Sequence, residues 1–318
     1  MKRDAFLKIA VAGLILLCHI SARAQDASSW KRNISLGNGA RAMNHLAEAE
    51  KWYLAALKDA RKFGSESSQM ISTMERLAAV YAAQGKYADA EPLYQEVVKL
   101  TAKLMGKYEN PVVLGRNDRT LLKIETGSGP EFYDSEVGAY KEARRLFIES
   151  TQDLIDCYKA ERKFPEAEQS ALRLIETLKK SAFRPEKRLN NASAINESLA
   201  DAYDELATLY LVQDKAVAAE SAYNQSLALR GDPDSVDLKA ALTLENLAVL
   251  YARQGRYEKA EPLFRQSLSI FEKYLGPDNA RLKSLLENLA LLLRKTARLV
   301  EAEKMSERAQ KIGGRKQN

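Results

Sequence analysis

The amino-acid sequence predicts an all-α solenoid, a row of antiparallel helical hairpins stacked side by side. One block of sequence occurs twice, at 77–94 and at 247–264, with few changes between the copies. Each copy has apolar residues at helical spacing on both sides of a Gln-Gly turn. Two helices joined by a short turn, repeated along a chain, indicate a solenoid rather than a globular bundle.

The second copy shows how each hairpin is built. Leu247, Ala248 and Tyr251 fall on one face of a first helix, which ends at Gln254-Gly255 because glycine permits the left-handed turn there. A second helix begins near Tyr257 and places Ala260, Phe264 and Leu268 along its inner side. Small residues where two helices cross and large residues beside them predict an antiparallel hairpin with close packing.

The same spacing recurs along the chain at intervals of about 41 or 42 residues, longer than a 34-residue repeat unit. Further hairpins are predicted around Leu206 and Leu289, a looser one around Leu154, and a second helix of a hairpin around Tyr53. The extra residues lengthen the helices and add links such as 275–279. We expect Tyr81, Tyr158, Tyr210 and Tyr251 to belong to the core.

The repeated motif resembles the long tetratricopeptide repeat of kinesin light chains, which many bacterial proteins also carry. The resemblance rests on Gln-Gly-Lys/Arg-Tyr-x-x-Ala-Glu-Pro-Leu-Tyr/Phe, a Leu-Gly-Pro-Asp link and a Leu-x-Asn-Leu-Ala helix. It is closest over 72–105 and 237–310 and partial over 193–230. It implies a right-handed superhelix of hairpins whose first helices line a concave face that holds partner peptides.

Residues 106–150 depart from the repeat. Gly127-Ser128-Gly129-Pro130 is a strong break, and 138–161 is predicted as one long helix after an irregular insert. The expected organisation is an N-terminal segment over 25–35, repeats 1–2 over 36–107, a degenerate repeat or irregular insert over 108–137, about four repeats over 138–312 with the first irregular, and a disordered tail over 313–318.

The N-terminus resembles a cleaved secretory signal over residues 1–24. Lys2 and Arg3 precede an apolar run of about a dozen residues, too short to span a bilayer, and Ala22-Arg23-Ala24 offers a signal-peptidase site. We therefore expect a periplasmic or secreted protein with no membrane span after cleavage. The alternative is a chain anchored by an uncleaved N-terminal signal.

Composition excludes several classes of function. Residues 1–24 carry much of the basic excess, and the remaining chain has 45 basic against 42 acidic residues, so nucleic acid is not an expected ligand. Only Cys157 and His45 remain after the signal, far apart in sequence, whereas metal sites and nucleophile–base pairs draw mostly on these residue types. We expect no enzyme activity, no metal and no cofactor.

A row of polar residues defines the predicted partner-binding face. Because the side opposite the packing seam should face the ligand, we take the residue two positions before each seam residue. These positions hold Glu75, Gln152, Asp204, Glu245 and Glu287. Such acids are good helix formers that water can simply solvate, or they form an acidic stripe that pairs with a basic segment of a partner.

Other residues extend that face. Arg253, Arg294 and Lys295 lie near the C-terminal ends of first helices, where cations complement the helix dipole and could flank the groove. Asn246 and Asn288 match the asparagine of the repeat motif, which the resemblance associates with a peptide backbone; contacts within the repeat are the alternative.

The sequence therefore predicts a non-catalytic scaffold or adaptor that binds a partner peptide or helix in its concave groove. The alternative is a structural subunit packed permanently in an envelope complex, because a solenoid offers a long surface for either purpose. The partner and the oligomeric state stay open.

Overall fold

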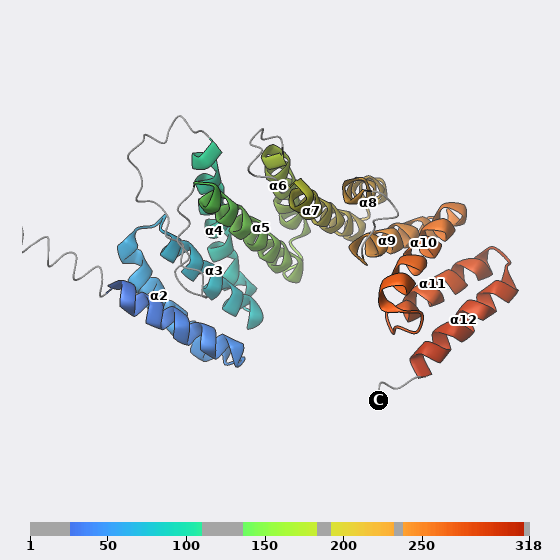
Figure 1. The fold of residues 1–318 in the computed structure, drawn as a ribbon, viewed down its shortest axis with the longest axis horizontal. Coiled ribbons are helices and arrows are strands. Elements are labelled where there is room, and N and C mark those ends of the chain that lie inside the picture. The colour runs from blue at the N-terminus through green and yellow to red at the C-terminus, as the bar shows by residue number, and fades with distance from the viewer. Residues whose placement is uncertain (1–25, 110–135, 183–191, 232–237, 315–318) are drawn as a thin grey trace, which may run out of the picture. The chain divides into compact units, whose positions relative to one another are not determined.

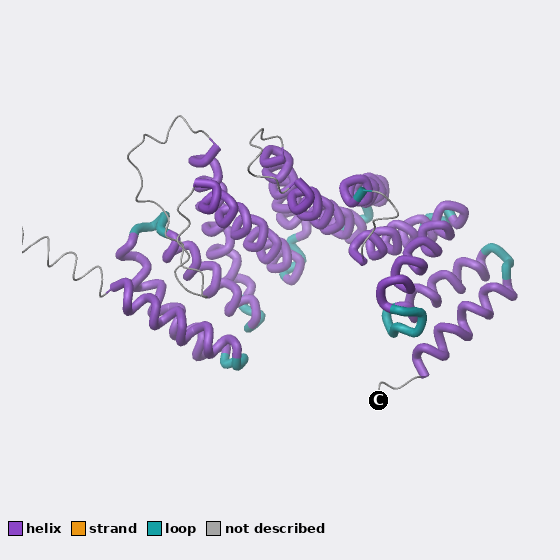
Figure 2. Tube along the Cα trace, in the orientation of Figure 1, coloured by secondary structure: helices purple, strands orange, loops and turns teal. Residues whose placement is uncertain are grey.

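The protein is all-α, as the sequence predicts. The computed structural model describes residues 26–109, 136–182, 192–231 and 238–314, and these contain helices and turns but no strand (Figures 1 and 2). The predicted signal peptide, most of the predicted insert and the end of the predicted tail lie outside the described residues. The chain divides into two compact units, residues 1–167 (unit 1) and 168–318 (unit 2).

Unit 1 is a run of hairpins. Residues 26–42 are helical, and the elements that follow are α2 (Leu46–Ala60), a 3₁₀ turn at Arg61–Phe63, α3 (Ser68–Ala83), α4 (Tyr87–Glu109) and α5 (Glu136–Ala160). Consecutive helices pack on one another, α2 on α3, α3 on α4 and α4 on α5. The helix over 26–42 begins within the segment 25–35 that the sequence set apart from the repeats. Helix α5 is continuous, as predicted for 138–161.

Unit 2 continues the pattern. It contains most of α6 (Phe164–Ala182), then α7 (Ala192–Val212), α8 (Ala216–Arg230), α9 (Leu238–Arg253), α10 (Tyr257–Leu275), α11 (Leu282–Lys295) and α12 (Leu299–Gly314). The tightest pairs are α7 with α8, α9 with α10 and α11 with α12, each the hairpin of one repeat. Helices α8 and α9 and helices α10 and α11 connect consecutive repeats.

Each first helix ends in the same left-handed turn. One residue per turn has a positive φ, and the next residue donates its N–H to a carbonyl five positions earlier, for example Arg256 to Tyr251 at 2.9 Å. The positive-φ residues are Asn44, Gly85, Arg162, Asp214, Gly255 and Ala297. Glycine signals only two of these turns in the sequence; in the others the hairpin geometry imposes the left-handed backbone on a residue with a Cβ.

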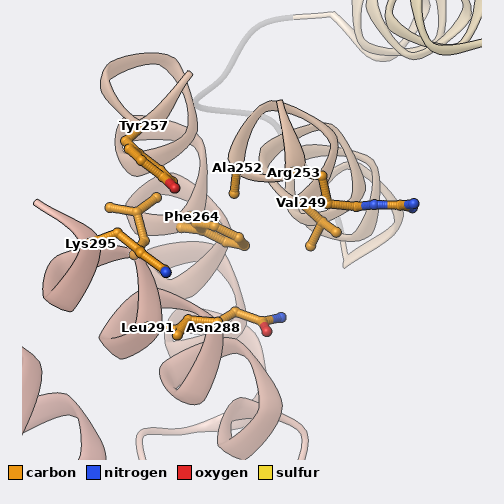
Figure 3. A pocket seen from close by; sticks show the side chains of 9 residues that line it. Val249, Ala252, Arg253, Tyr257, Phe264, Asn288, Leu291 and Lys295 are labelled. Carbon is orange, nitrogen blue, oxygen red and sulfur yellow. The ribbon is translucent and has the colours of Figure 1, made fainter. Parts of the chain in front are cut away.

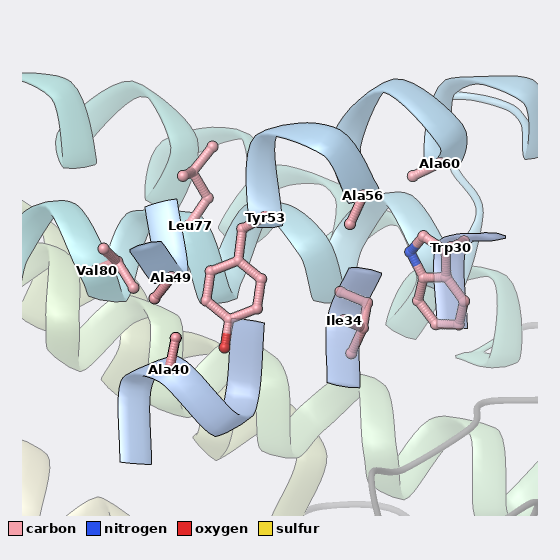
Figure 4. Close-up of a cluster of buried hydrophobic side chains, with 9 residues drawn as sticks. All are labelled: Trp30, Ile34, Ala40, Ala49, Tyr53, Ala56, Ala60, Leu77 and Val80. Atoms are coloured by element: carbon pink, nitrogen blue, oxygen red, sulfur yellow. The ribbon is translucent and has the colours of Figure 1, made fainter. Parts of the chain in front are cut away.

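The packing of small against large residues follows the predicted scheme. An alanine on each second helix is completely or almost completely buried: Ala49, Ala90, Ala167, Ala219, Ala260 and Ala302. One turn later Tyr53, Tyr94, Tyr223 and Phe264 are buried as well. A cluster in unit 1 illustrates this, with Tyr53 lying over the helix at 26–42 and Trp30 buried at its end (Figure 4). Trp30 donates its indole N–H to Thr73 at 2.9 Å.

Consecutive repeats are also joined by an ion pair that the sequence did not reveal. The glutamate lies directly after the buried alanine of a second helix. It accepts a hydrogen bond from a Lys or Arg of the next repeat, at the position directly after that repeat's positive-φ residue. We call this pair the clasp. The clasps are Glu50–Lys86, Glu91–Lys163, Glu168–Lys215, Glu220–Arg256 and Glu261–Arg298, at 3.0, 2.6, 2.7, 2.7 and 2.7 Å.

The four tyrosines that the sequence predicted to be in the core differ in burial, and three of them contact a clasp cation. Tyr158 and Tyr251 are buried, whereas Tyr81 and Tyr210 are half-buried. The clasp cations Lys86, Lys215 and Arg256 lie over the rings of Tyr81, Tyr210 and Tyr251 at 5.5, 5.6 and 4.4 Å. These tyrosines therefore support the junction between repeats.

Candidate functional site

Two helices of unit 2 present matching exposed faces. On α9 the positions 242, 246, 249 and 253 share one side of the helix, and on α11 the positions 284, 288, 291 and 295 do so. We call these eight residues the open face: Leu242, Asn246, Val249, Arg253, Ser284, Asn288, Leu291 and Lys295. Leu242 is 41% exposed and Leu291 is 55% exposed. An apolar side chain is therefore left in water on both helices.

The open face leads into a pocket between α9, α10 and α11. The pocket has a volume of about 290 Å³ (Figure 3). Its apolar wall consists of Val249, Ala252, Phe264, Leu291 and Leu292. Small-molecule sites usually measure about 300–1,000 Å³, so this pocket is at the lower limit of that range and suits a side chain better than a large ligand.

Four polar side chains surround the apolar wall, Arg253, Tyr257, Asn288 and Lys295. In Figure 3 Lys295 extends toward Phe264, whereas Arg253 extends away from both. Within the described part of the chain, none of the four has a side-chain hydrogen bond or an ion pair. These side chains can therefore form hydrogen bonds or ion pairs with a bound molecule without first breaking a contact within the protein.

The structure brings together three of the residues that the sequence proposed. Arg253, Asn288 and Lys295 line the pocket, and Asn246 lies on the open face one helical turn before Val249. Arg294 is turned toward α12 instead, where it donates to Ser306 at 2.7 Å and lies 4.0 Å from Glu303.

The three acidic residues of unit 2 that the sequence proposed for the binding face do not line the pocket. Glu245 is only 7% exposed, and its carboxylate accepts from Arg281 at 2.5 Å. Asp204 accepts from Arg230 and from Thr243, both at 2.8 Å, and burial raises the pKa of its carboxyl group. Glu287 is exposed and lies 4.0 Å from Lys283 of its own helix. Asp204 and Glu245 thus serve contacts within the protein.

The two candidates in unit 1 are partly buried. Glu75 is 19% exposed at its side chain, lies 3.4 Å from Arg76, and has a raised pKa because it is buried. Gln152 is half-buried on α5. The open-face positions of α5, by register with α9, are Glu149, Asp153 and Asp156.

A large part of the circumference of each first helix is buried, and this explains why the predicted acidic residues do not lie on its exposed side. Glu245 lies opposite Leu247, but Ala241 and Ala248 beside it on α9 are buried too, because a first helix packs on its own partner and on neighbouring repeats. The exposed side of the helix, which is the open face, is therefore opposite the centre of this buried part and not opposite Leu247 alone. Sequence reasoning missed Val249 and Leu291, although their equivalent places in two consecutive repeats were a usable signal.

Groups suited to catalysis are sparse in the described residues. No cluster of three or more His, Cys, Asp or Glu is placed to hold a metal ion in that part of the chain. Cys157 is buried, and burial raises the pKa of its thiol to about 11. Among the same residues no helix has the length and apolar character of a membrane span.

Comparison with known proteins agrees with this architecture. The sequence matches the tetratricopeptide-repeat family over residues 30–103 and 239–313. BtubC (BKLC) from P. vanneervenii has 16% identity and a TM-score of 0.58, over 86% of this chain and 94% of that chain. A tetratricopeptide repeat protein from Parabacteroides merdae has 15% identity and a TM-score of 0.54, over 89% and 80%.

A putative kinesin light chain from Podosopora anserina with nearly identical TPR-like repeats has 18% identity and a TM-score of 0.51, over 80% of this chain and 99% of that chain. These likenesses concern the fold. Tetratricopeptide repeats generally mediate protein–protein interaction, and their fold is typically a non-catalytic scaffold. The chain therefore carries tetratricopeptide repeats over residues 30–103 and 239–313, and its fold is similar to that of kinesin-light-chain-like repeat proteins.

Proposed function

We propose that this protein is a non-catalytic adaptor that binds an extended segment of a partner protein on the open face of unit 2. The observation that carries the proposal is the pocket of about 290 Å³ on that face, with Leu291 exposed at its edge and polar side chains without partners around it. Burying exposed apolar area contributes about 25 cal/mol per Å², so a segment that covers this wall gains free energy.

A permanently packed subunit is the second candidate. A fixed interface is expected to be broad and largely apolar, whereas the open face alternates apolar residues with Asn, Ser, Arg and Lys. That alternation favours a segment that binds reversibly, with backbone groups and side chains both recognised.

The experiment that tests the proposal is photocrosslinking in cells that produce the protein. A photoreactive amino acid at position 291 should capture a partner, and the same residue at position 217 should not. Val217 is 82% exposed on α8, which is not one of the two helices that form the open face, so it matches Leu291 as an exposed apolar position. Leu291→Glu should remove capture from a probe at position 249, whereas Val217→Glu should leave it. Equal capture from 291 and 217 would contradict the proposal.

For unit 1 we propose in addition that a basic segment of a partner binds to the acidic residues of α5. Glu149, Asp153 and Asp156 on α5 support it, since opposite charge speeds association and fixes register. Glu149 and Asp156 already contact Arg145 and Lys159 of the same helix, at 2.5 and 3.0 Å. A basic ligand would have to compete with these pairs.

We also propose that binding takes place after export, in the periplasm or outside the cell. The basis is the signal-like sequence of residues 1–24. Fractionation and mass spectrometry of the mature N-terminus test this: an N-terminus at Gln25 in the exported fraction supports it, and an intact Met1 in the cytoplasmic fraction contradicts it.

A further inference from the structure

We propose that the outer side of α8 joins two copies of this chain into a reversible dimer. Four exposed residues, which we call the α8 face, lie on that side of the helix: Val217, Ser221, Asn224 and Ala228. They follow one another at steps of four, three and four residues, opposite the buried Ala219. The open face belongs to α9 and α11, so this inference does not rest on the proposed function.

The α8 face carries no charge, unlike the corresponding face of every other described second helix. In register with the buried alanine, the charged residues at these four positions are Lys51 and Lys58 on α2, Lys99 on α4, Glu176 on α6, Glu258 and Arg265 on α10, and Lys304, Glu307 and Lys311 on α12. A helix normally turns charged residues toward water and keeps uncharged ones for a contact. The α8 face therefore has the composition of a surface that another helix covers.

The two charged residues of α8 are both engaged within unit 2. Glu220 accepts from Arg256 at 2.7 Å in a clasp. Arg230, whose side chain is only 6% exposed, donates to Asp201 at 2.7 Å and to Asp204 at 2.8 Å. Neither residue brings an unpaired charge to the α8 face.

The absence of charge favours a second copy of the chain over a different protein. A face that binds another protein can use charges that complement the partner. In a two-fold symmetric contact the same patch is present on both sides, so charges of one sign on a single helix face would meet their own kind and repel. The α8 face avoids this at all four positions, whereas α2 has two lysines there.

A two-fold axis perpendicular to α8 would pair the four residues with one another. The two helices then run antiparallel, so that Val217 of one copy meets Ala228 of the other and Ser221 meets Asn224. Val217 is 82% exposed, more than any other large apolar side chain of the described residues, and this contact would bury it. Ser221 and Asn224 each contain a donor and an acceptor and can therefore bond to each other.

The size of the α8 face sets the expected strength of the dimer. A helix of 15 residues is about 22 Å long and about 10 Å wide. Two such faces bury much less than the about 800 Å² per partner of a stable interface. We therefore expect a dissociation constant of about 0.01–1 mM.

Sedimentation equilibrium tests the dimer on protein purified from the cells that produce it. Between about 10 µM and 1 mM the average mass of the wild-type protein should rise from that of a monomer toward twice that value. Ser221→Lys should weaken dimerisation at least tenfold, because the two introduced ammonium groups lie near the axis and repel each other. Lysine is compatible with the fold at this position, since α2 and α12 have Lys51 and Lys304 there.

The matched control is Ser269→Lys. Ser269 is an exposed serine of α10 at the position equivalent to Ala228, so the same substitution adds the same charge to another second helix. It should leave dimerisation unchanged. Circular dichroism checks that both variants are folded.

A mixture of two variants identifies the contact directly. Ser221→Glu alone should be as monomeric as Ser221→Lys, but the two mixed together should form a heterodimer in which opposite charges meet across the axis. Added salt should weaken this heterodimer and leave the uncharged wild-type contact largely unaffected.

Three results would overturn the inference. They are a wild-type protein that is still monomeric at about 1 mM, equal effects of Ser221→Lys and Ser269→Lys, and a mixture of the Lys and Glu variants that stays monomeric. Any crosslink from position 217 in cells would join two copies of this chain, and its mass distinguishes it from capture of another protein. Partner capture from position 291 should be the same in Ser221→Lys as in the wild-type protein, so the two proposals fail separately.

Discussion

The guanidinium group of Arg281 donates to the carboxylate of Glu245 at 2.5 Å, across the junction between two repeats of unit 2. The same guanidinium lies over the ring of Phe271, 4.8 Å from its centroid. Glu245 is thus one part of a packed contact between α9 and the link before α11. A residue that the sequence placed on the binding face stabilises the stack.

Substitution of Glu245 should therefore affect stability. Glu245→Gln removes the buried charge that pairs with the half-buried Arg281, and we expect a loss of about 2 kcal/mol in the free energy of unfolding, typical of a hydrogen bond to a charged group. Urea denaturation followed by circular dichroism measures it. Glu287→Gln is the control, since Glu287 is exposed and its loss should change stability by less than about 0.5 kcal/mol. Equal effects would contradict the assignment.

Two glutamates of unit 1 should respond to pH in opposite directions. Burial raises the pKa of Glu75, so this group favours the folded state at low pH and loses that contribution as pH rises through its folded pKa. The hydrogen bond from Lys86 lowers the pKa of Glu50, so its contribution is present at neutral pH and is lost as pH falls through its folded pKa.

The corresponding measurement is unfolding free energy as a function of pH. At neutral pH Glu75→Gln should be at least as stable as the wild-type protein, and Glu50→Gln should be less stable. As the pH falls toward about 3 both differences should shrink, because protonation of each carboxyl group removes the charge that distinguishes it from Gln. A Glu75→Gln protein that is destabilised at neutral pH would show that its contact with Arg76 outweighs burial.

The left-handed turn at Ala297 should be improved by glycine. Ala297 has φ +58°, a conformation that costs an ordinary residue about 1 kcal/mol. Ala297→Gly should raise the free energy of unfolding by up to this amount, after the added entropy of the unfolded chain is subtracted. Ala102→Gly, at an exposed position inside α4, should lower it by about 1 kcal/mol. Thermal denaturation distinguishes the two signs.

Two glycines of the helix over 26–42 provide a matched pair. A Cβ on Gly37 would lie 2.4 Å from the ring of Tyr53, whereas a Cβ on Gly39 would meet nothing within 4 Å. Gly37→Ala should therefore overpack the first hairpin and cost about 1–3 kcal/mol. Gly39→Ala should stabilise the protein by about 0.5–1 kcal/mol through helix propensity. If Gly37→Ala is also stabilising, the close approach of this helix to α2 is wrong.

The sequence by itself determined the all-α fold, the hairpins and their cores. Helical periodicity and the repeated block place Ala260 and Phe264 in the packing seam without knowledge of their neighbours, because each repeat forms most of its contacts within itself or with the next one. The continuous helix over 138–161 was predictable for the same local reason. The left-handed turns at Arg162, Asp214 and Ala297 were not, since no glycine marks them.

Only the tertiary structure decided which polar residues are available to a partner. Glu245 and Asn246 are neighbours in sequence, yet one is buried in an ion pair with Arg281 and the other lies on the open face. The difference depends on how much of the surface of α9 the adjacent repeats bury, and on the position of Arg281, which pairs with Glu245 from the link before α11. Periodicity in one helix cannot supply either quantity, because both belong to contacts between repeats.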